Sequence, residues 1–439
     1  MSLDFERCAE HIEVGARPYW RGLVDVVSGV MIEATGLPAA MGEVCRIQRG
    51  AAGPIDAEVV GFRGTTTLLM PHGHLEGIAP NQEVTALGAP FTVGVGDELL
   101  GRVIDGFGLP LDDVTDKSIT NLPERRLVRQ DAPTPLDRTP ITEILTTGVR
   151  SIDAAITLGQ GQRLGIFAGS GVGKSTLLGQ ISNGSDADVV VCVLVGERGR
   201  EVRAFLEDVL GPEGRKKAVV IAATSDRPPI ERYLAPFVGV TVAEYFRDQG
   251  KNVLVVMDSI TRFAGAAREI GLAAGEPPTV RGYPPSFFAT VPKLIERMGR
   301  TEKGSITGLI TVLLDGDDPN EPVADTLRGL LDGHLYLSRD LAQRGIFPPV
   351  DILPSLSRLM SELVDPEHEE CARNLRRLLA AWKEGRDLVE VGAYRSGTNP
   401  DLDEAITRMP LLELFLKQTP REFSSRADTL ELLKMALGV

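Results

Sequence analysis

The stretch AGSGVGKST, residues 168–176, constrains the fold more than any other part of the sequence. It follows the apolar run RLGIFA and leads into STLLGQI, so it joins an expected strand to an expected helix. Its alternating glycines let the backbone wrap around an anion and point several N–H groups inward. The start of the helix adds positive potential at the same place. The stretch predicts a phosphate-binding loop, with a chance glycine-rich turn as the alternative.

Side chains within this loop predict how a nucleotide and its metal ion are held. Lys174 would reach the β- and γ-phosphates, and Ser175 would offer its hydroxyl group to Mg²⁺. The first position of the motif is Ala168 instead of glycine, a mild change because a methyl group fits at the end of a strand. The predicted nucleotide-binding residues are Gly169, Ser170, Gly171, Val172, Gly173, Lys174, Ser175 and Thr176.

Apolar runs alternate with helical stretches between residues 160 and 360. Most of these runs are continuously apolar, as expected for strands that helices cover on both faces. The alternation of strand and helix predicts an α/β core with a parallel sheet. The expected strands are residues 163–168, 188–195, 217–223, 252–257 and 306–314.

The regions on either side of this core have a different character. Residues 20–104 contain short β-rich runs with turn signals about every ten residues, which favours a small antiparallel barrel or sandwich. Beyond Pro366 the expected strands stop, and the first helix that follows places an apolar stripe on one face. That stripe consists of Leu375, Leu378, Leu379 and Trp382. The predicted division is an N-terminal segment (1–18), a β domain (19–104), the core (105–365) and a helical domain (366–439).

Charged residues follow two of the expected strands. Asp258 ends the run NVLVVMD, where an enzyme with a phosphate loop needs an acid to support the Mg²⁺ shell. Glu197 follows DVVVCVLVG, and at that edge its carboxylate could orient an attacking water while Arg198 meets phosphate charge. Alternatively, Glu197 and Glu201 only complement the dipole of the next helix. This structural role is favoured for Glu201 and Arg200, whereas for Glu197 position alone leaves the two readings balanced.

Composition indicates which classes of partner the chain can bind and in which cellular compartment it is expected. A net charge of −14 makes the chain a poor general partner for nucleic acid or anionic lipid. The four cysteines form no CxxC pair, and no apolar run reaches the roughly 18 residues that span a bilayer. The acidic N-terminal segment lacks the apolar core of a signal peptide. We therefore expect a cytoplasmic protein with reduced thiols and no nucleic-acid partner.

Five segments carry a resemblance to a known family: GSGVGKST, VGERGREV, TVAEYFRDQGKNVLVVMDSITRFAGAAREIGLAAGEPP, RGYPPSFFATVPKLIERMGR and DILPSLSRLM. They resemble the type III export ATPases, which are relatives of the catalytic subunit of rotary ATP synthases. The match is dense from residue 145 to 365, and GDELLGRVIDGFGLPLDD (96–113) resembles the junction between barrel and core in that family. The resemblance implies an α/β P-loop core of the RecA/F1 type, with an N-terminal β-barrel and a C-terminal helical domain.

The resemblance implies catalytic roles for five residues. Lys174 binds phosphate, and Glu197 in GER matches the family's catalytic glutamate. Arg198, and Arg262 in DSITR, match arginines near the γ-phosphate. Arg358, in PSLSRLM, matches an arginine finger that a neighbouring subunit supplies, since a guanidinium group can meet two developing phosphate charges at once. A surface salt bridge is the alternative role for Arg358.

The same resemblance assigns the remaining site residues. Ser175 and Asp258, the Walker B acid, would hold Mg²⁺. Phe347, in GIFPPVD, takes the place of an aromatic residue that packs on adenine, and an ordinary core phenylalanine is the equally weighted alternative. Tyr394, in GAYRSG, would line the other side of the base. The implied cofactors are ATP and Mg²⁺.

Partners follow from the same resemblance. A water-orienting glutamate and a finger for the neighbouring site lie in one chain, so head-to-tail contacts would close a ring, and the family implies a homohexamer. The Gly- and Pro-rich segment 271–288 would face a central channel and a rotor-like stalk protein, with a rigid structural loop as the alternative. Other implied partners are export-apparatus proteins, a peripheral-stalk-like regulator, export substrates and chaperones. The implied location is cytoplasmic and peripheral at the inner-membrane export apparatus, which allows peripheral membrane association.

We therefore expect an ATP hydrolase that energises or gates protein export through a flagellar-type type III secretion apparatus. An injectisome ATPase is the nearest alternative, since VSGVMIEATGLPAAMGEVCRI resembles flagellar members only somewhat more. A non-hydrolysing subunit of a rotary ATPase would share the fold but would not need Glu197. A Rho-like RNA translocase would need clustered basic residues beside exposed aromatics in the N-terminal domain. That domain offers Trp20 and Phe62 but few clustered lysines or arginines.

Overall fold

The chain divides into two compact units. The first contains the residues up to Thr92 together with Pro228–Glu231 and Glu269–Pro277, and the second contains the rest. The predicted N-terminal segment 1–18 lies outside the described residues, and the predicted domain boundaries stay predictions. The computed structural model describes residues 20–112, 119, 122–314, 316, 318 and 321–439.

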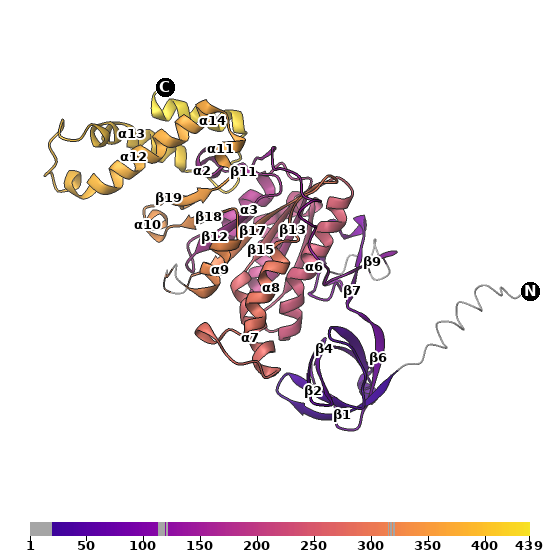
Figure 1. Ribbon diagram of the computed structural model, residues 1–439. Coiled ribbons are helices and arrows are strands. Elements are labelled where there is room, and N and C mark those ends of the chain that lie inside the picture. The colour runs from indigo at the N-terminus through magenta and orange to yellow at the C-terminus, as the bar shows by residue number, and fades with distance from the viewer. Residues whose placement is uncertain (1–19, 113–118, 120–121, 315, 317, 319–320) are drawn as a thin grey trace, which may run out of the picture. The chain divides into compact units, whose positions relative to one another are not determined.

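The main part of the first unit is a closed β-barrel, visible in Figure 1 as a ring of indigo strands. Every neighbouring pair of strands is antiparallel. Because the ring of strands is closed, the barrel leaves no strand edge open. Fully buried side chains such as Ile32, Cys45 and Leu69 fill its interior. The sequence left barrel and sandwich open, and the structure is a barrel with the strand order β1 (Arg21–Ser28), β2 (Met31–Thr35), β5 (Thr66–Pro71), β4 (Ile55–Arg63), β3 (Glu43–Ile47) and β6 (Glu83–Pro90).

One large sheet forms the core of the second unit, and its strands are parallel except for β16 and β19. All five strands predicted from continuous apolar runs are present, as β12, β13, β14, β15 and β17. Strands β8, β16, β18 and the edge strand β19 were not predicted from the sequence. The spatial order is β19 (Val350–Ser357), β18 (Gly333–Leu337), β12 (Arg163–Ala168), β17 (Ser305–Leu313), β15 (Asn252–Asp258), β13 (Val189–Val195), β14 (Ala218–Ala223) and β8 (Val103–Ile104), with β16 (Gly299–Arg300) beside β17.

Helices pack around this sheet, as predicted for an α/β core (Figure 1). Two small ribbons pair β7 (Thr92–Val95) with β9 (Glu124–Leu127) and β10 (Ile144–Leu145) with β11 (Leu158–Gly159). The described helices of the core are α2 (Arg150–Ala155), α3 (Lys174–Gly184), α4 (Gly199–Ala204), a π-helix (Phe205–Leu210), α5 (Gly211–Lys216), α6 (Pro229–Asp248), α7 (Ile260–Ala273), α8 (Pro285–Ile295), α9 (Pro322–Leu330) and α10 (Arg339–Gln343).

The chain ends in a group of helices: α11 (Met360–Leu363), α12 (Pro366–Glu390), α13 (Pro400–Leu416) and α14 (Arg426–Leu437). Helix α12 begins at the proline where the sequence analysis ended its strands, and the Asp365 side chain caps it by accepting the N–H of His368. The predicted apolar stripe is confirmed, since Leu375 and Leu378 are buried in the same core as the sheet. Within the part of the chain that the structure describes, no helix is both long and apolar enough to cross a membrane.

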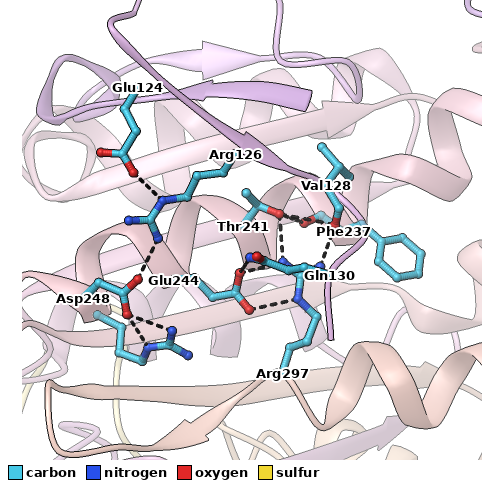
Figure 2. A network of polar contacts seen from close by, with 10 residues as sticks. Glu124, Arg126, Val128, Gln130, Phe237, Thr241, Glu244, Asp248 and Arg297 are labelled. Atoms are coloured by element: carbon cyan, nitrogen blue, oxygen red, sulfur yellow. Dashed lines mark hydrogen bonds and ion pairs between the residues drawn. The ribbon is translucent and has the colours of Figure 1, made fainter. Parts of the chain in front are cut away.

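A buried ion pair joins the segment after α8 to helix α6, and the connector after β9 forms hydrogen bonds with both partners. The guanidinium group of Arg297 donates to both carboxylate oxygens of Glu244, at 2.9 and 2.6 Å, and both side chains are almost fully buried. Figure 2 shows the same guanidinium group reaching the Thr241 hydroxyl and the Val128 carbonyl oxygen, while the Gln130 amide also bonds Glu244. The pair therefore satisfies its hydrogen bonds internally, which a buried charge pair requires.

Candidate active site

The predicted phosphate loop lies where the sequence analysis expected it, between β12 and α3. Gly171 and Gly173 have positive φ angles of 75° and 99°, a conformation that glycine adopts without steric cost. Gly173 is the residue before α3 and has no side chain to bond the first N–H groups of the helix. Those N–H groups and the helix dipole are therefore available to an anion, as the motif predicts.

Lys174 and Asp258 come together at this loop. Their side chains form a hydrogen-bonded ion pair in which both groups are largely buried. Asp258 ends β15, and Thr311 of the intervening strand β17 donates its hydroxyl to the same carboxylate at 2.9 Å. Thr311 was not predicted from the sequence, where it is one of two threonines in a largely apolar run.

Arg262 packs closely against Gly196, the residue before Glu197, at the end of β13. Gly196 has a positive φ of 69°, and a Cβ added there would lie only 2.9 Å from Cβ of Arg262. The absence of a side chain at Gly196 thus lets Arg262, from the first turn of α7, lie against the loop that carries Glu197. The structure therefore places Arg262 against the residue that precedes Glu197.

A small cavity of about 160 Å³ joins Glu197 to the phosphate loop. Burial raises the pKa of Glu197 to about 7, and the charge of Asp258 and a hydrogen bond that the protonated Glu197 donates to Glu201 add to the rise, while Lys174 opposes it. A carboxylate with a pKa near neutrality is suited to take a proton from a water molecule. The lining residues are Ser175, Leu194, Glu197, Glu201, Val202, Ala204, Phe205, Val209 and Asp258.

Glu201 has more than the structural role that the sequence analysis favoured. It does cap α4, because its carboxylate accepts the backbone N–H of Arg198 at 3.3 Å. Its carboxyl group also bonds Glu197, and this bond lowers the pKa of Glu201. Glu197 precedes the helix, so this contact depends on the turn at Gly196 and not on helical spacing. Arg198 itself is exposed, and its described ion pair, at 3.9 Å, is with Glu201.

Phe347 lies beside the phosphate loop, whereas Tyr394 is engaged elsewhere. A Cβ added at Gly173 would lie 3.7 Å from the Phe347 ring, and Phe347 is 45% exposed, which an ordinary core phenylalanine would not be. The hydroxyl group of Tyr394 lies 3.0 Å from the carbonyl oxygen of Asn399 and 3.1 Å from the carboxylate of Asp403. These bonds hold the turn between α12 and α13. The role of Tyr394 at the base stays a prediction that none of its described contacts supports.

Arg358 and the phosphate loop lie at opposite ends of the parallel strands. Strands β12 and β18 run parallel, whereas β19 returns antiparallel, so that its last residue, Ser357, pairs with Gly333 at the start of β18. Arg358 therefore sits at the amino end of the parallel strands, and the loop follows the carboxyl end of β12. Its guanidinium group donates to the carbonyl oxygen of Arg328 at 3.2 Å.

Two family models match the chain. The model of the ATP synthase alpha/beta family, nucleotide-binding domain, matches residues 148–357, and the model of the T3SS EscN ATPase C-terminal domain matches residues 364–435. The flagellum-specific ATP synthase of Bacillus subtilis (strain 168) is 49% identical over 420 residues, which is 95% of each chain. The type 3 secretion system ATPase of Xanthomonas euvesicatoria is 49% identical over 430 residues, covering 98% of this chain and 96% of that one.

A solved structure extends the likeness to three dimensions. The assembled ATPase EscN from the enteropathogenic E. coli type III secretion system matches with a TM-score of 0.89 at 44% identity, covering 95% of this chain and 100% of EscN. EscN in complex with its central stalk EscO matches with a TM-score of 0.87. Fold, phosphate loop and relatives agree, and the chain belongs to the type III export ATPases, enzymes that share their nucleotide-binding domain with the ATP synthase alpha/beta family.

Proposed function

We propose that this chain hydrolyses Mg²⁺-bound ATP at the contacts between neighbouring copies of itself and thereby energises or gates protein export. The observation that carries the proposal is the position of Arg358 at the amino ends of the parallel strands and of the phosphate loop at the carboxyl end of β12. A finger at that distance cannot serve its own loop, whereas head-to-tail neighbours would bring the two together. We infer a closed ring, and a homohexamer as its size.

Within the proposed site, Lys174 would move from Asp258 to the β- and γ-phosphates when nucleotide binds. Ser175 and Asp258 fit a Mg²⁺ ion, because both oxygen ligands line the same small cavity beside the loop. The ion would neutralise phosphate charge when bound. Phe347 would pack on the base, since its half-exposed ring lies next to Gly173.

Glu197 would orient the attacking water and take its proton, which its position in that cavity and its raised pKa support. Arg262, against the Glu197 loop, and Arg198, through a change of side-chain rotamer, would meet charge on the γ-phosphate. Arg358 of the neighbouring copy would stabilise the transition state, an effect that arginine fingers exert by about 10³- to 10⁵-fold in rate. Together, these residues would supply the base for the attacking water and the positive charge on the phosphate that phosphoryl transfer to water needs.

The export role is proposed at the level that the relatives share. The flagellar and type 3 secretion relatives are both 49% identical to this chain, so a type III export apparatus is the shared setting. A rotor-like stalk is a proposed partner, because EscN assembles with its central stalk EscO. Export-apparatus proteins, a peripheral-stalk-like regulator, substrates and chaperones complete the proposed partners. We place the enzyme in the cytoplasm, peripheral to the inner membrane.

Mixing two inactive variants tests the shared site. Lys174→Ala removes the phosphate-binding group and Arg358→Ala removes the finger, so each chain alone should lose hydrolysis. In a mixture, some contacts pair an intact loop with an intact finger, and hydrolysis should partly return as protein concentration rises. No recovery, with mixed assembly verified by cross-linking, would overturn the proposal. An Arg203→Ala chain, altered only at an exposed helical ion pair, is the control partner for each variant.

A further inference from the structure

The turn between α13 and α14, residues 417–425, is bonded into the core around the nucleotide-binding loop. Gln418 is only 4% exposed within this turn. Its side-chain oxygen accepts the N–H of Arg150 at 2.9 Å, and its side-chain nitrogen donates to the carbonyl oxygens of Gly148 and Glu422, each at 2.7 Å. Every hydrogen-bonding position that the amide needs is therefore used inside the protein.

The backbone of the same residue holds Phe347. The N–H of Gln418 donates to the carbonyl oxygen of Phe347 at 2.7 Å. Pro348 and Pro349 follow Phe347 and have no N–H to donate, so the loop has few bonds of its own to fix the phenylalanine. The side chain of Gln418 fixes the turn, and the turn fixes the backbone from which the Phe347 ring extends toward Gly173.

The helix that begins at the phosphate loop also bonds the turn. Gln180, two turns along α3 and 3% exposed, donates to the carbonyl oxygens of Thr419 and Glu422, each at 3.2 Å. A cavity of about 760 Å³ opens along the same side of α3 and is lined by residues that include Thr176, Gln180 and Arg421. The turn thus contacts both the phosphate-binding helix and the aromatic residue beside it.

We infer that Gln418 is a positioning residue that holds Phe347 in place for the nucleotide base, so that docking of the C-terminal turn sets affinity for the base. The inference rests on the proposed function, in which Phe347 packs on adenine. Phosphate groups bind the loop and Lys174, which the turn does not contact in the described structure. By reciprocity, nucleotide binding must then tighten the docking of the turn and of the helices joined by it.

The test compares a nucleotide with a ligand that lacks the base. Gln418→Met keeps the length of the side chain and removes its hydrogen bonds. Calorimetry on the full chain should show ADP binding about 5- to 20-fold more weakly, a loss in the range expected for disturbed hydrogen bonding and base stacking, with pyrophosphate binding unchanged. Gln180→Met, altered on the other side of the contact, should shift ADP in the same direction and keeps the test open if Gln418→Met fails to fold.

A matched control distinguishes positioning of Phe347 by Gln418 from a general contribution of Gln418 to the stability of the fold. Gln162 is also fully buried and also bonds three groups, Gly159, Asp332 and Ser357, far from the turn. Gln162→Met should lower thermal stability as Gln418→Met does, without changing affinity for either ligand. Phe347→Ala should weaken ADP binding too, and combining it with Gln418→Met should add less than the sum of the two effects.

The outcomes that overturn the inference differ from those that overturn the proposed function. Equal losses of ADP and pyrophosphate affinity, additive effects of the two substitutions, or unchanged ADP affinity in both glutamine variants would each refute positioning by Gln418. Hydrogen exchange in residues 417–425 that does not slow when ADP binds would refute the reciprocal effect. If the Lys174→Ala variant binds ADP as tightly as the parent chain does, the proposed site itself is refuted.

Discussion

The ammonium group of Lys174 is paired with the carboxylate of Asp258, and Thr311 holds that carboxylate from the strand between them. This pair joins the first residue of the phosphate-binding helix to the end of β15. The lysine that would bind phosphate is therefore held at the end of β15 by its ion pair with Asp258.

Lys174→Met should affect both catalysis and stability. Loss of a charge that contacts the transferred phosphate lowers catalysis by about 10²- to 10³-fold or more. Asp258 would remain buried without its partner, which costs about 3 kcal/mol of unfolding free energy. Steady-state hydrolysis and urea unfolding measure the two effects. Lys216→Met, which breaks an exposed pair with Glu213, should change neither, and equal behaviour of the two variants would contradict the buried pair.

Glu197→Gln should change how stability depends on pH. Because the folded chain raises the pKa of Glu197 from 4.5 to about 7, the folded state binds this proton more tightly than the unfolded state. The parent chain should therefore lose stability as pH rises from about 4.5 to about 7 and show no further loss from this group above that range.

Glutamine cannot ionise, so the nucleotide-free variant should gain stability relative to the parent across that interval. We expect about 1–2 kcal/mol, because solvent around the partly exposed carboxylate screens the effect. Unfolding in urea at pH 4.5, 6 and 8 measures it, with Glu207→Gln, an exposed acid, as the control. A difference that stays constant with pH would show that Glu197 does not hold the proton.

Gly196→Ala should impair hydrolysis although the residue has no side chain to contribute. A methyl group would lie 2.9 Å from Cβ of Arg262 on a backbone that already has a positive φ, so Arg262 and the adjoining Glu197 must move. A displacement of about 1 Å in a catalytic group can cost about 100-fold in kcat. Gly199→Ala is the control, because nothing lies within 4 Å of its added Cβ. Similar kcat values for both variants would refute the close approach.

Arg297→Met should destabilise the chain far from the site. Glu244 would stay buried without its cation, and single losses from buried pairs cost about 3–5 kcal/mol. Adding Glu244→Gln should recover part of this loss, since the double variant no longer buries an uncompensated charge. Denaturant unfolding of the parent, both single variants and the double variant measures the coupling. Figure 2 shows the contacts that the four chains compare.

The sequence predicted what depends on local pattern. The phosphate loop lies between its strand and helix, and Asp258 reaches Lys174, because motif and strand polarity determine where loop ends meet in a parallel sheet. Strand β19 was missed because it contains Pro354 and alternates buried with exposed residues, as a strand at the edge of a sheet can.

Contacts between segments that are far apart in the sequence could not be predicted from local sequence patterns. Gln418 is separated by about 70 residues of sequence from Phe347 and by 268 from Arg150, and nothing in LKQTPREF distinguishes it from a surface glutamine. Even a short-range contact could escape the sequence: Glu201 was predicted to complement the dipole of the next helix, and its bond to Glu197 depends on the direction in which the turn at Gly196 sends the chain.

Because Arg358 is separated from the phosphate loop of its own chain, the number of complete sites depends on how the copies assemble. In the proposed ring, each copy would carry the phosphate half of one site and the finger half of another, at opposite ends of the parallel strands. An open row of copies always leaves one loop without a finger, so a pair would complete half of its sites. Only closure of the row completes the last one. Hydrolysis per copy should therefore make its final increase at the moment of closure, and an opened ring would lose a whole site when a single contact breaks.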